Sequence, residues 1–258
     1  MKIIFWCEFP ELVDWPKARS LIDFHTDIYI ACRNLADFKH WKSQAKSSNI
    51  KPCAWPVLAK SHGYWFSGFI DKNDIDMLRQ FKGIDMKIDI EPPIPIKRGY
   101  SLISMAAWLV PYLFLRSKNR YYLSRIISEL SKSSNIILST FPFPLFIIRN
   151  YLSSINSKAI RRNYMAYSTF IPWMLQPLFR LYMGWFIRKR LKEDSNTIFV
   201  VGLLGHGIFG NEPVYKNVLQ LRNDILWLKS FGVRAIAVYR LGAVLDRPES
   251  LKVIREFI

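Results

Sequence analysis

Eight short apolar runs recur along the chain, separated by longer segments with helical periodicity. The runs cover residues 3–7, 27–32, 50–55, 85–90, 135–139, 163–167, 197–204 and 233–239. Most of them are continuous rather than alternating, which is typical of parallel strands buried on both faces. Strands that alternate with helices predict a parallel sheet, and eight such units predict a closed (β/α)8 barrel.

The chain length supports the same architecture. The chain has 258 residues, and a barrel of this kind needs about 250. We therefore predict an α/β protein made of a single (β/α)8 TIM barrel domain that spans residues 1–258. An open, doubly wound sheet would use the same alternation of elements. It is disfavoured because neither a GxGxxG motif nor a P-loop follows the first run.

The chain is strongly basic, with 37 Lys and Arg residues against 20 Asp and Glu residues and a net charge of +17. A surplus of this size favours anionic partners such as membrane lipid, nucleic acid or acidic polysaccharide, and a basic, solvated surface is the structural alternative. The sequence has no zinc-finger spacing, aromatic RNA-binding signature or long basic helix. Nucleic acid is therefore not expected as a partner.

The cysteines and the first residues bear on the cellular compartment. Cys7, Cys32 and Cys53 form no CxxC pair, which argues against a disulfide scaffold and suits a reducing compartment. We expect all three to be buried structural thiols. The first apolar run is too short for a signal peptide, and Glu8 interrupts it. These features predict a cytoplasmic protein, peripheral on the inner face of the membrane if it binds lipid.

Two apolar segments, residues 102–115 and 167–190, follow the fourth and sixth runs and exceed what an ordinary soluble barrel needs. The first is shorter than the ~20 residues that span a bilayer, and the second contains Gln176, Arg180 and two prolines. Both suit helices that lie in a membrane interface, where Trp settles at headgroup level and Lys and Arg pair with anionic lipid. The alternative is packing on the barrel wall or in a dimer interface.

Polar side chains at the ends of the runs are candidates for catalysis, because the active site of such a barrel lies at the carboxyl ends of its strands. Asp89 and Glu91 are two residues apart, so both point to one side of the fourth run. If that side is the interior, the carboxyl groups crowd together and one pKa rises. A carboxylic acid that stays protonated suits general acid catalysis on a glycosidic oxygen. A structural ion pair with Arg33 or Arg240 is the alternative.

The sequence GIDMKIDIE at residues 83–91 resembles the fourth-strand motif of the chitinase-like glycosidases, family 18, which ends in D-x-E. The sequence MAY at residues 165–167 resembles the M-x-Y of their sixth strand. The resemblance implies that Glu91 is the general acid and that Asp89 orients the acetamido group of the substrate. It also implies that Tyr167 hydrogen-bonds this group as it attacks the sugar carbon.

The chain departs from that family at two positions. Lys87 and Ser168 each stand where an aspartate is usual. Other carboxylates allow a different mechanism, because Glu8 ends the first run and Glu212 follows the seventh. Either can act as nucleophile or base opposite Glu91, as in glycosidases that use two carboxylates.

Side chains near the other strand ends are expected to bind the substrate. This set is Arg33, Asn34, Trp55, Trp65, His206, Asn211, Glu212, Tyr239 and Arg240. Aromatic faces stack on sugar rings, although they also line apolar pockets and cores. The glycine-rich segment 205–211 is suited to holding a phosphate. No HExxH or similar spacing is present, so neither a metal nor another cofactor is predicted.

Together these patterns predict a glycoside hydrolase-like enzyme that acts on a glycan or glycolipid near a membrane surface. Two alternatives stay open. A barrel that handles the phosphate of a lipid headgroup would use the glycine-rich segment and the basic charge. A non-catalytic barrel that binds membrane or a partner protein would explain the charge and the apolar segments. It would leave Glu8, Asp89 and Glu91 without a role.

Overall fold

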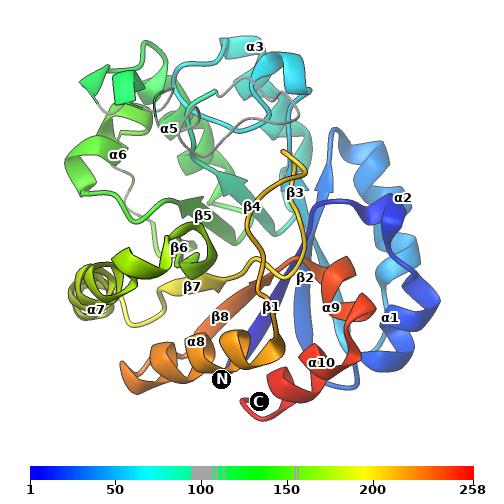
Figure 1. The fold of residues 1–258 in the computed structure, drawn as a ribbon. Coiled ribbons are helices and arrows are strands. Elements are labelled where there is room, and N and C mark those ends of the chain that lie inside the picture. Colours follow the sequence, from blue (N-terminus) through cyan, green and yellow to red (C-terminus); the bar gives the residue numbers. More distant parts are fainter. Residues whose placement is uncertain (94–106, 108–109, 113, 154, 156) are drawn as a thin grey trace.

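The computed structural model describes residues 1–93, 107, 110–112, 114–153, 155 and 157–258. Eight parallel strands, paired in sequence order, close into a barrel (Figure 1). The strands are β1 (Lys2–Cys7), β2 (Thr26–Cys32), β3 (Ile50–Pro56), β4 (Met86–Asp89), β5 (Ile136–Thr140), β6 (Ile160–Met165), β7 (Ile198–Val201) and β8 (Ala235–Tyr239). The (β/α)8 TIM barrel predicted from the sequence is confirmed.

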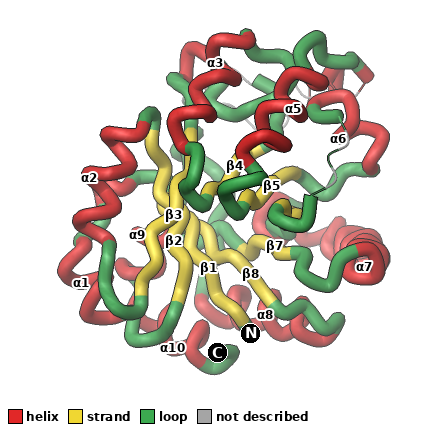
Figure 2. The backbone as a smooth tube through the Cα atoms, turned by 180° about the vertical axis from the view of Figure 1, so that it is seen from behind, coloured by secondary structure: helices red, strands yellow, loops and turns green. Residues whose placement is uncertain are grey.

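Helices surround the strands (Figures 1 and 2). The α-helices are α1 (Trp15–Leu21), α2 (Leu35–Ala45), α3 (Lys72–Asp76), α5 (Arg120–Leu130), α6 (Leu145–Tyr151), α7 (Gln176–Glu193), α8 (Val218–Ser230), α9 (Leu241–Asp246) and α10 (Pro248–Arg255). Short 3-10 helices are η1 (Pro10–Leu12), η2 (Lys60–His62), η3 (Met77–Phe81), η4 (Ser168–Phe170) and η5 (Trp173–Leu175). The two ends of the chain meet, since the amino group of Met1 donates to the carbonyl oxygen of Phe257 at 2.7 Å.

Two strands differ from their predicted positions by three residues at one end, and the others differ by one or two. The sixth was expected at residues 163–167, but β6 begins at Ile160, which pairs with Ile136 of β5. Arg161 and Arg162 lie inside this strand and are only half-buried, so the sequence shows no apolar run there. The seventh was expected at residues 197–204, but β7 is shorter because the chain leaves the sheet after Val201.

The side chains of each strand alternate between the barrel interior and the layer of helices, as the pleat of a strand requires. On β1, Ile4 and Trp6 pack with the interior group, whereas Ile3 and Phe5 pack in the core between strands and helices. This alternation determines which residues can reach the mouth of the barrel. Glu8 continues the series of Ile4 and Trp6, so it faces the interior.

The three cysteines are free thiols and are all buried. Burial raises the pKa of Cys32 and of Cys53 to about 12. Because the thiolate is the reactive form, these side chains behave as small apolar groups in the core.

The two apolar segments have different outcomes. Most of residues 102–115 lies outside the described residues. Residues 167–190 form η4, η5 and most of α7, a long helix on the outside of the barrel (Figure 1). No helix in the described part of the chain is both long and apolar enough to cross a membrane.

A pair of leucines on α8 tests the packing of the helix layer. Leu228 is fully buried, whereas Leu219 on the same helix is 64% exposed. We expect Leu228→Ala to lower the free energy of unfolding by about 2–5 kcal/mol, because it leaves a cavity in the core. The control, Leu219→Ala, should change it by less than about 0.5 kcal/mol. Urea unfolding followed by circular dichroism measures both, and equal losses would contradict the assigned buried face.

Candidate active site

Strand β4 directs three ionisable residues to the barrel interior. Met86 and Ile88 pack outward, in the core that includes residues of α3 and α5. Because successive side chains alternate, Lys87, Asp89 and Glu91 point to the other face. All three are buried and line one cavity.

The cavity lies at the carboxyl ends of the strands, where barrel enzymes carry their active sites. Its lining residues end or directly follow most of the strands, from Glu8 after β1 to Tyr239 at the end of β8. The space between the atoms amounts to about 650 Å³, counting the part open to solvent. Aromatic rings make up much of the wall, including those of Trp65 and Phe209, whose centroids are 6.1 Å apart.

Lys87 forms a buried ion pair with Asp89. Its Nζ lies 2.7 Å from Oδ1 of Asp89 and donates a hydrogen bond of 2.8 Å to Oδ2. The same ammonium sits 3.4 Å from the ring centre of Trp55 and 4.9 Å from that of Trp6. Burial lowers the pKa of Lys87, and the negative charge of Asp89 opposes that shift. The cation beside Asp89 is therefore Lys87, and neither Arg33 nor Arg240 lines the cavity.

Glu8 is held by two tyrosine hydroxyls. Tyr64 donates to Oε1 at 3.3 Å, and Tyr239 donates to Oε2. Burial raises the pKa of Glu8 to about 7, while the hydrogen bond from Tyr239 and the charge of Lys87 act in the opposite direction. Glu8 thus releases its proton closer to neutral pH than an ordinary carboxyl group does.

The pKa of Glu91 is shifted in the same direction. Burial raises the pKa of its carboxyl group well above the ordinary value, the charge of Asp89 adds to this, and Lys87 opposes it. Glu91 therefore keeps its proton to a higher pH than an ordinary glutamic acid does. Two buried carboxyl groups with raised pKa values in one cavity can supply the proton donor and the base that acid and base catalysis requires.

Glu212 closes the loop that follows β7. Its carboxylate accepts the backbone N–H groups of Gly207 at 3.0 Å and Phe209 at 2.9 Å. Nδ1 of His206 lies 2.8 Å from the carbonyl oxygen of Glu212. A Cβ atom at Gly207 would collide with the Tyr239 hydroxyl and the Glu212 carboxylate. The N–H groups that could hold a phosphate here already bind the protein's own carboxylate.

The structure brings together most of the side chains that the sequence singles out. Glu8, Trp55, Trp65, Asp89, Glu91, Tyr167, Glu212 and Tyr239 line the cavity. Arg33, Asn34, His206, Asn211 and Arg240 do not. Asn34 instead caps α2, where its side chain accepts the backbone N–H of Asp37 at 2.9 Å. Arg33 and His206 are exposed, and the guanidinium of Arg240 lies 5.0 Å from the ring centre of Phe9.

Sequence reasoning missed several residues of the wall. They are Phe141, Met165, Phe170, Leu203, Ile208 and Phe209. Phe141 and Leu203 come just after β5 and β7, so their position next to a strand end was a usable signal. Met165 ends β6 and begins the M-x-Y sequence, and Ile208 and Phe209 lie in the glycine-rich segment 205–211, so these positions also carried a signal. Nothing in the sequence separates Phe170 from ordinary core residues.

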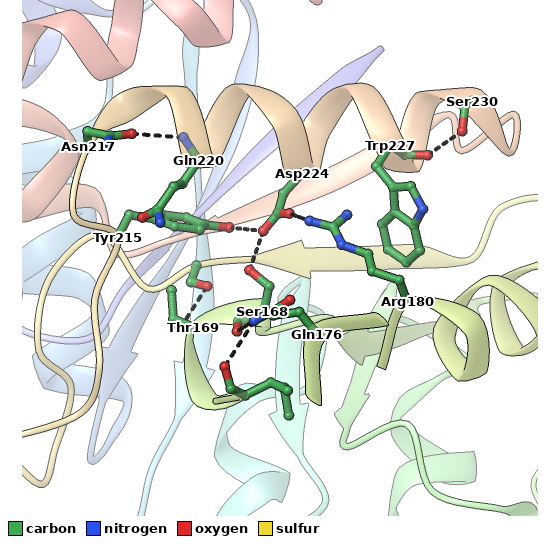
Figure 3. A network of polar contacts seen from close by, with 12 residues as sticks. Ser168, Thr169, Gln176, Arg180, Tyr215, Asn217, Gln220, Asp224, Trp227 and Ser230 are labelled. Atoms are coloured by element: carbon green, nitrogen blue, oxygen red, sulfur yellow. Dashed lines mark hydrogen bonds and ion pairs between the residues drawn. The ribbon is translucent and has the colours of Figure 1, made fainter. Parts of the chain in front are cut away.

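Tyr167 and Ser168 are adjacent in sequence, but their side chains lie in different surroundings. The ring of Tyr167 lines the cavity, whereas the hydroxyl of Ser168 donates to Oδ2 of Asp224 on α8 (Figure 3). Tyr215 donates to the same oxygen at 2.7 Å, and the guanidinium of Arg180 pairs with Oδ1. A buried carboxylate from α8 thus lies beside Ser168, the position at which family 18 has an aspartate. We refer to these contacts of Asp224 as the Asp224 clasp.

Comparison of whole folds finds similar solved structures. The glycoside hydrolase domain of PgaB (BpsB) from Bordetella bronchiseptica matches 100% of this chain and 98% of its own, with a TM-score of 0.61 and 9% identity. A xylose isomerase domain protein from Planctomyces limnophilus covers 99% and 95%, with a TM-score of 0.55 and 8% identity. The GH18 chitinase ChiB from Flavobacterium johnsoniae covers 99% and 93%, with a TM-score of 0.52 and 13% identity.

These likenesses extend over the whole chain but concern the fold alone, because the identities are so low. No family model matches the sequence, and no curated protein does. The distant resemblance to chitinase-like TIM-barrel glycosidases is confirmed at the level of the barrel.

The raised pKa of Glu8 predicts a pH-dependent loss of stability. In the folded protein, Glu8 keeps its proton until about pH 7. In the unfolded chain, it releases this proton near its ordinary pKa of 4.5. Stability therefore falls as the pH rises between these values, by on the order of 2–3 kcal/mol. Glu8→Gln has no such proton to lose. We therefore expect the difference in the free energy of unfolding between this variant and the native protein to shift in favour of the variant by about this amount from pH 5 to pH 8.

Urea unfolding at the two pH values measures this difference. Glu249→Gln, at an exposed position, is the control and should have the same effect at both. An effect of Glu8→Gln that does not change with pH would contradict the raised pKa.

Proposed function

We propose that the chain is a glycoside hydrolase that acts on a glycan or glycolipid, with Glu91 as general acid and Glu8 as nucleophile or base. The observation that carries the proposal is the pair of buried carboxyl groups, both with raised pKa values, that line one aromatic cavity at the strand ends. An acid that stays protonated and a carboxylate that can ionise are the two groups that cleavage of a glycosidic bond needs. The glycoside hydrolase and chitinase folds among the similar structures support a carbohydrate ligand.

The neighbours of these two residues favour this division of roles. Asp89 is engaged by the ammonium of Lys87. The carboxylate of Glu212 accepts the backbone N–H groups of Gly207 and Phe209. Glu8 is therefore the carboxylate that we assign to act opposite Glu91. Tyr167 keeps its proton, because burial raises its pKa well above the ordinary value. Its hydroxyl can therefore donate a hydrogen bond to a sugar oxygen.

The phosphate-handling alternative has less support. Its natural anion site was the glycine-rich loop after β7. Because the N–H groups of Gly207 and Phe209 already donate to Glu212, a phosphate there would have to displace a buried carboxylate. The cavity also contains more acidic than basic groups among its described lining, which repels an anion.

The catalytic role of Glu91 is tested by its amide variant. Glu91→Gln should lower kcat/KM at least about a hundredfold, because the side chain keeps its shape but has no acidic proton to give to the leaving oxygen. The measurement is hydrolysis of a panel of chromogenic glycosides and sugar oligomers. Glu249→Gln serves as the exposed control and should keep full activity. Full activity in a folded Glu91→Gln protein would remove Glu91 from the mechanism.

We also propose that the protein works in the cytoplasm, peripheral on an anionic membrane surface that it binds through η5 and α7. The residues that support this are the exposed apolar side chains Trp173, Met174 and Leu175 of η5 and Leu178, Leu181, Tyr182 and Trp185 of α7. Trp173 is 82% and Leu181 is 74% exposed. Met183, Phe186 and Ile187 cover the opposite, buried face of the same helix. A continuous apolar stripe on the outside of a helix marks an interaction surface.

The charges at the end of α7 favour lipid over a neutral apolar partner. Arg188, Lys189 and Lys192 are exposed and follow the apolar stripe directly. Arg190 is not part of this group, because it is buried and pairs with Glu193 at 2.6 Å. Apolar side chains flanked by cations are typical of helices that lie at an anionic bilayer surface.

The stripe also lies close to the cavity along the chain. Phe170 lines the cavity, and the exposed Trp173 follows three residues later. The Asp224 clasp holds this segment against α8. A sugar headgroup attached to a lipid is therefore a suitable substrate for a barrel bound in this orientation.

Vesicle binding tests the membrane surface. Replacing Trp173, Leu178 and Leu181 together by Ser should weaken binding to vesicles of phosphatidylserine and phosphatidylcholine by more than about tenfold, because their apolar surface no longer enters the interface. Leu12→Ser combined with Leu219→Ser removes exposed leucines from other elements and should leave binding unchanged.

Arg188→Glu combined with Lys189→Glu should weaken binding to these vesicles most at low salt, and should have little effect with pure phosphatidylcholine. Unchanged affinity in both the serine and the glutamate variants would reject α7 as the membrane surface.

A further inference from the structure

The charges around the cavity do not balance. Among its described lining residues are the carboxyl groups of Glu8, Asp89, Glu91 and Glu212, and the ammonium of Lys87 is the one basic group. All five side chains are buried. Charges of one sign that are buried together repel each other and resist ionisation, unless a cation accompanies them.

Contacts within the protein provide a cation or backbone N–H donors for only some of these carboxyl groups. Lys87 is committed to Asp89, at 2.7 Å. Glu212 is held by two backbone N–H groups. Glu8 receives hydrogen bonds only from neutral hydroxyl groups in the contacts described above. Glu8 and Glu91 thus face the cavity without a cation of their own among its described lining.

Two features of the wall show what kind of ligand this space suits. The ammonium of Lys87 already rests 3.4 Å from the ring centre of Trp55, so an amine can be stabilised here by an indole face. Tyr167 also lines the cavity, and its hydroxyl can donate a hydrogen bond to an oxygen atom of a ligand.

We propose that the sugar cleaved in this cavity carries a free amino group, so that the substrate is the glycoside of a cationic amino sugar. The ammonium supplies the missing positive charge beside Glu8 and Glu91, the hydroxyl oxygens supply acceptors, and the aromatic rings pack against the faces of the sugar. This inference rests on the proposed glycosidase function and names the substrate class of the same site.

One of the two departures from the family 18 pattern, Lys87, agrees with this substrate. Lys87 forms an ion pair with Asp89, the residue that the resemblance assigns to orienting an acetamido group. An amino sugar has no acetamido oxygen to attack its own anomeric carbon, so a carboxylate of the protein must serve instead, and Glu8 is available. The charge of a bound ammonium also lowers the pKa of Glu91 towards the working pH, where a general acid is most effective.

A panel of p-nitrophenyl glycosides tests the proposal without knowledge of the natural linkage. It contains glucosamine and galactosamine, their N-acetyl forms, and glucose and galactose, each as both anomers. We expect kcat/KM for an amino glycoside to exceed that for its N-acetyl and neutral counterparts by about tenfold or more. Binding of the same compounds to Glu91→Gln, measured by calorimetry, should show the same order.

A second variant attributes the preference to charge. In Glu8→Gln, the affinity advantage of the amino glycosides should fall severalfold, whereas binding of the neutral glycosides should change little. Hydrolysis of N-acetyl or neutral glycosides with equal or greater efficiency would overturn the amino-sugar inference and leave the glycosidase standing. No binding or hydrolysis of any glycoside by the folded protein would overturn both.

Discussion

A lysine buried inside the barrel organises the chemistry around it. Lys87 lies between the rings of Trp6 and Trp55 and pairs with Asp89. Removing one partner of a buried ion pair leaves an uncompensated charge, which is why such pairs constrain everything packed around them. Here the ion pair holds the carboxylate of Asp89 beside the ammonium of Lys87. Of the other three carboxyl groups in the cavity, Glu212 accepts two backbone N–H groups, whereas Glu8 and Glu91 have no cation of their own among the described lining residues.

The pleat of β4 is the reason that these groups meet. A strand repeats every two residues, so Lys87, Asp89 and Glu91 share one face, and Met86 and Ile88 anchor the other face in the core. A shift of register by one residue would bury the three ionisable side chains among apolar helices, which no hydrogen-bond network there could compensate. The apolar residues of this strand therefore maintain the site as much as the polar ones do.

Local periodicity explains how much of this could be predicted. The alternation of strands and helices gave the barrel, and the two-residue spacing placed Asp89 beside Glu91. Position at a strand end was a weaker guide: it identified Glu8 and Tyr239, which line the cavity, but also Asn34, which caps a helix. Both roles use a polar residue directly after a strand, and the sequence does not distinguish them.

Contacts between distant parts of the chain were beyond such reasoning. Tyr64 reaches Glu8 from 56 residues away, and Asp224 reaches Ser168 across the same separation. The sequence marked Lys87 as a departure from a family pattern, but its contacts with Trp6 of β1 and Trp55 of β3 emerged only in the closed barrel.

The loop after β7 makes the acidity of Glu8 depend on a residue that bears no functional group. Gly207 leaves room for the Tyr239 hydroxyl, and that hydroxyl moderates the rise in the pKa of Glu8. Any side chain at this position would push the hydroxyl aside and make Glu8 a weaker acid, although neither the glutamate nor the tyrosine had changed. In variants of this barrel, the pH at which Glu8 ionises thus depends partly on the missing side chain of Gly207. A survey confined to polar residues would overlook this dependence.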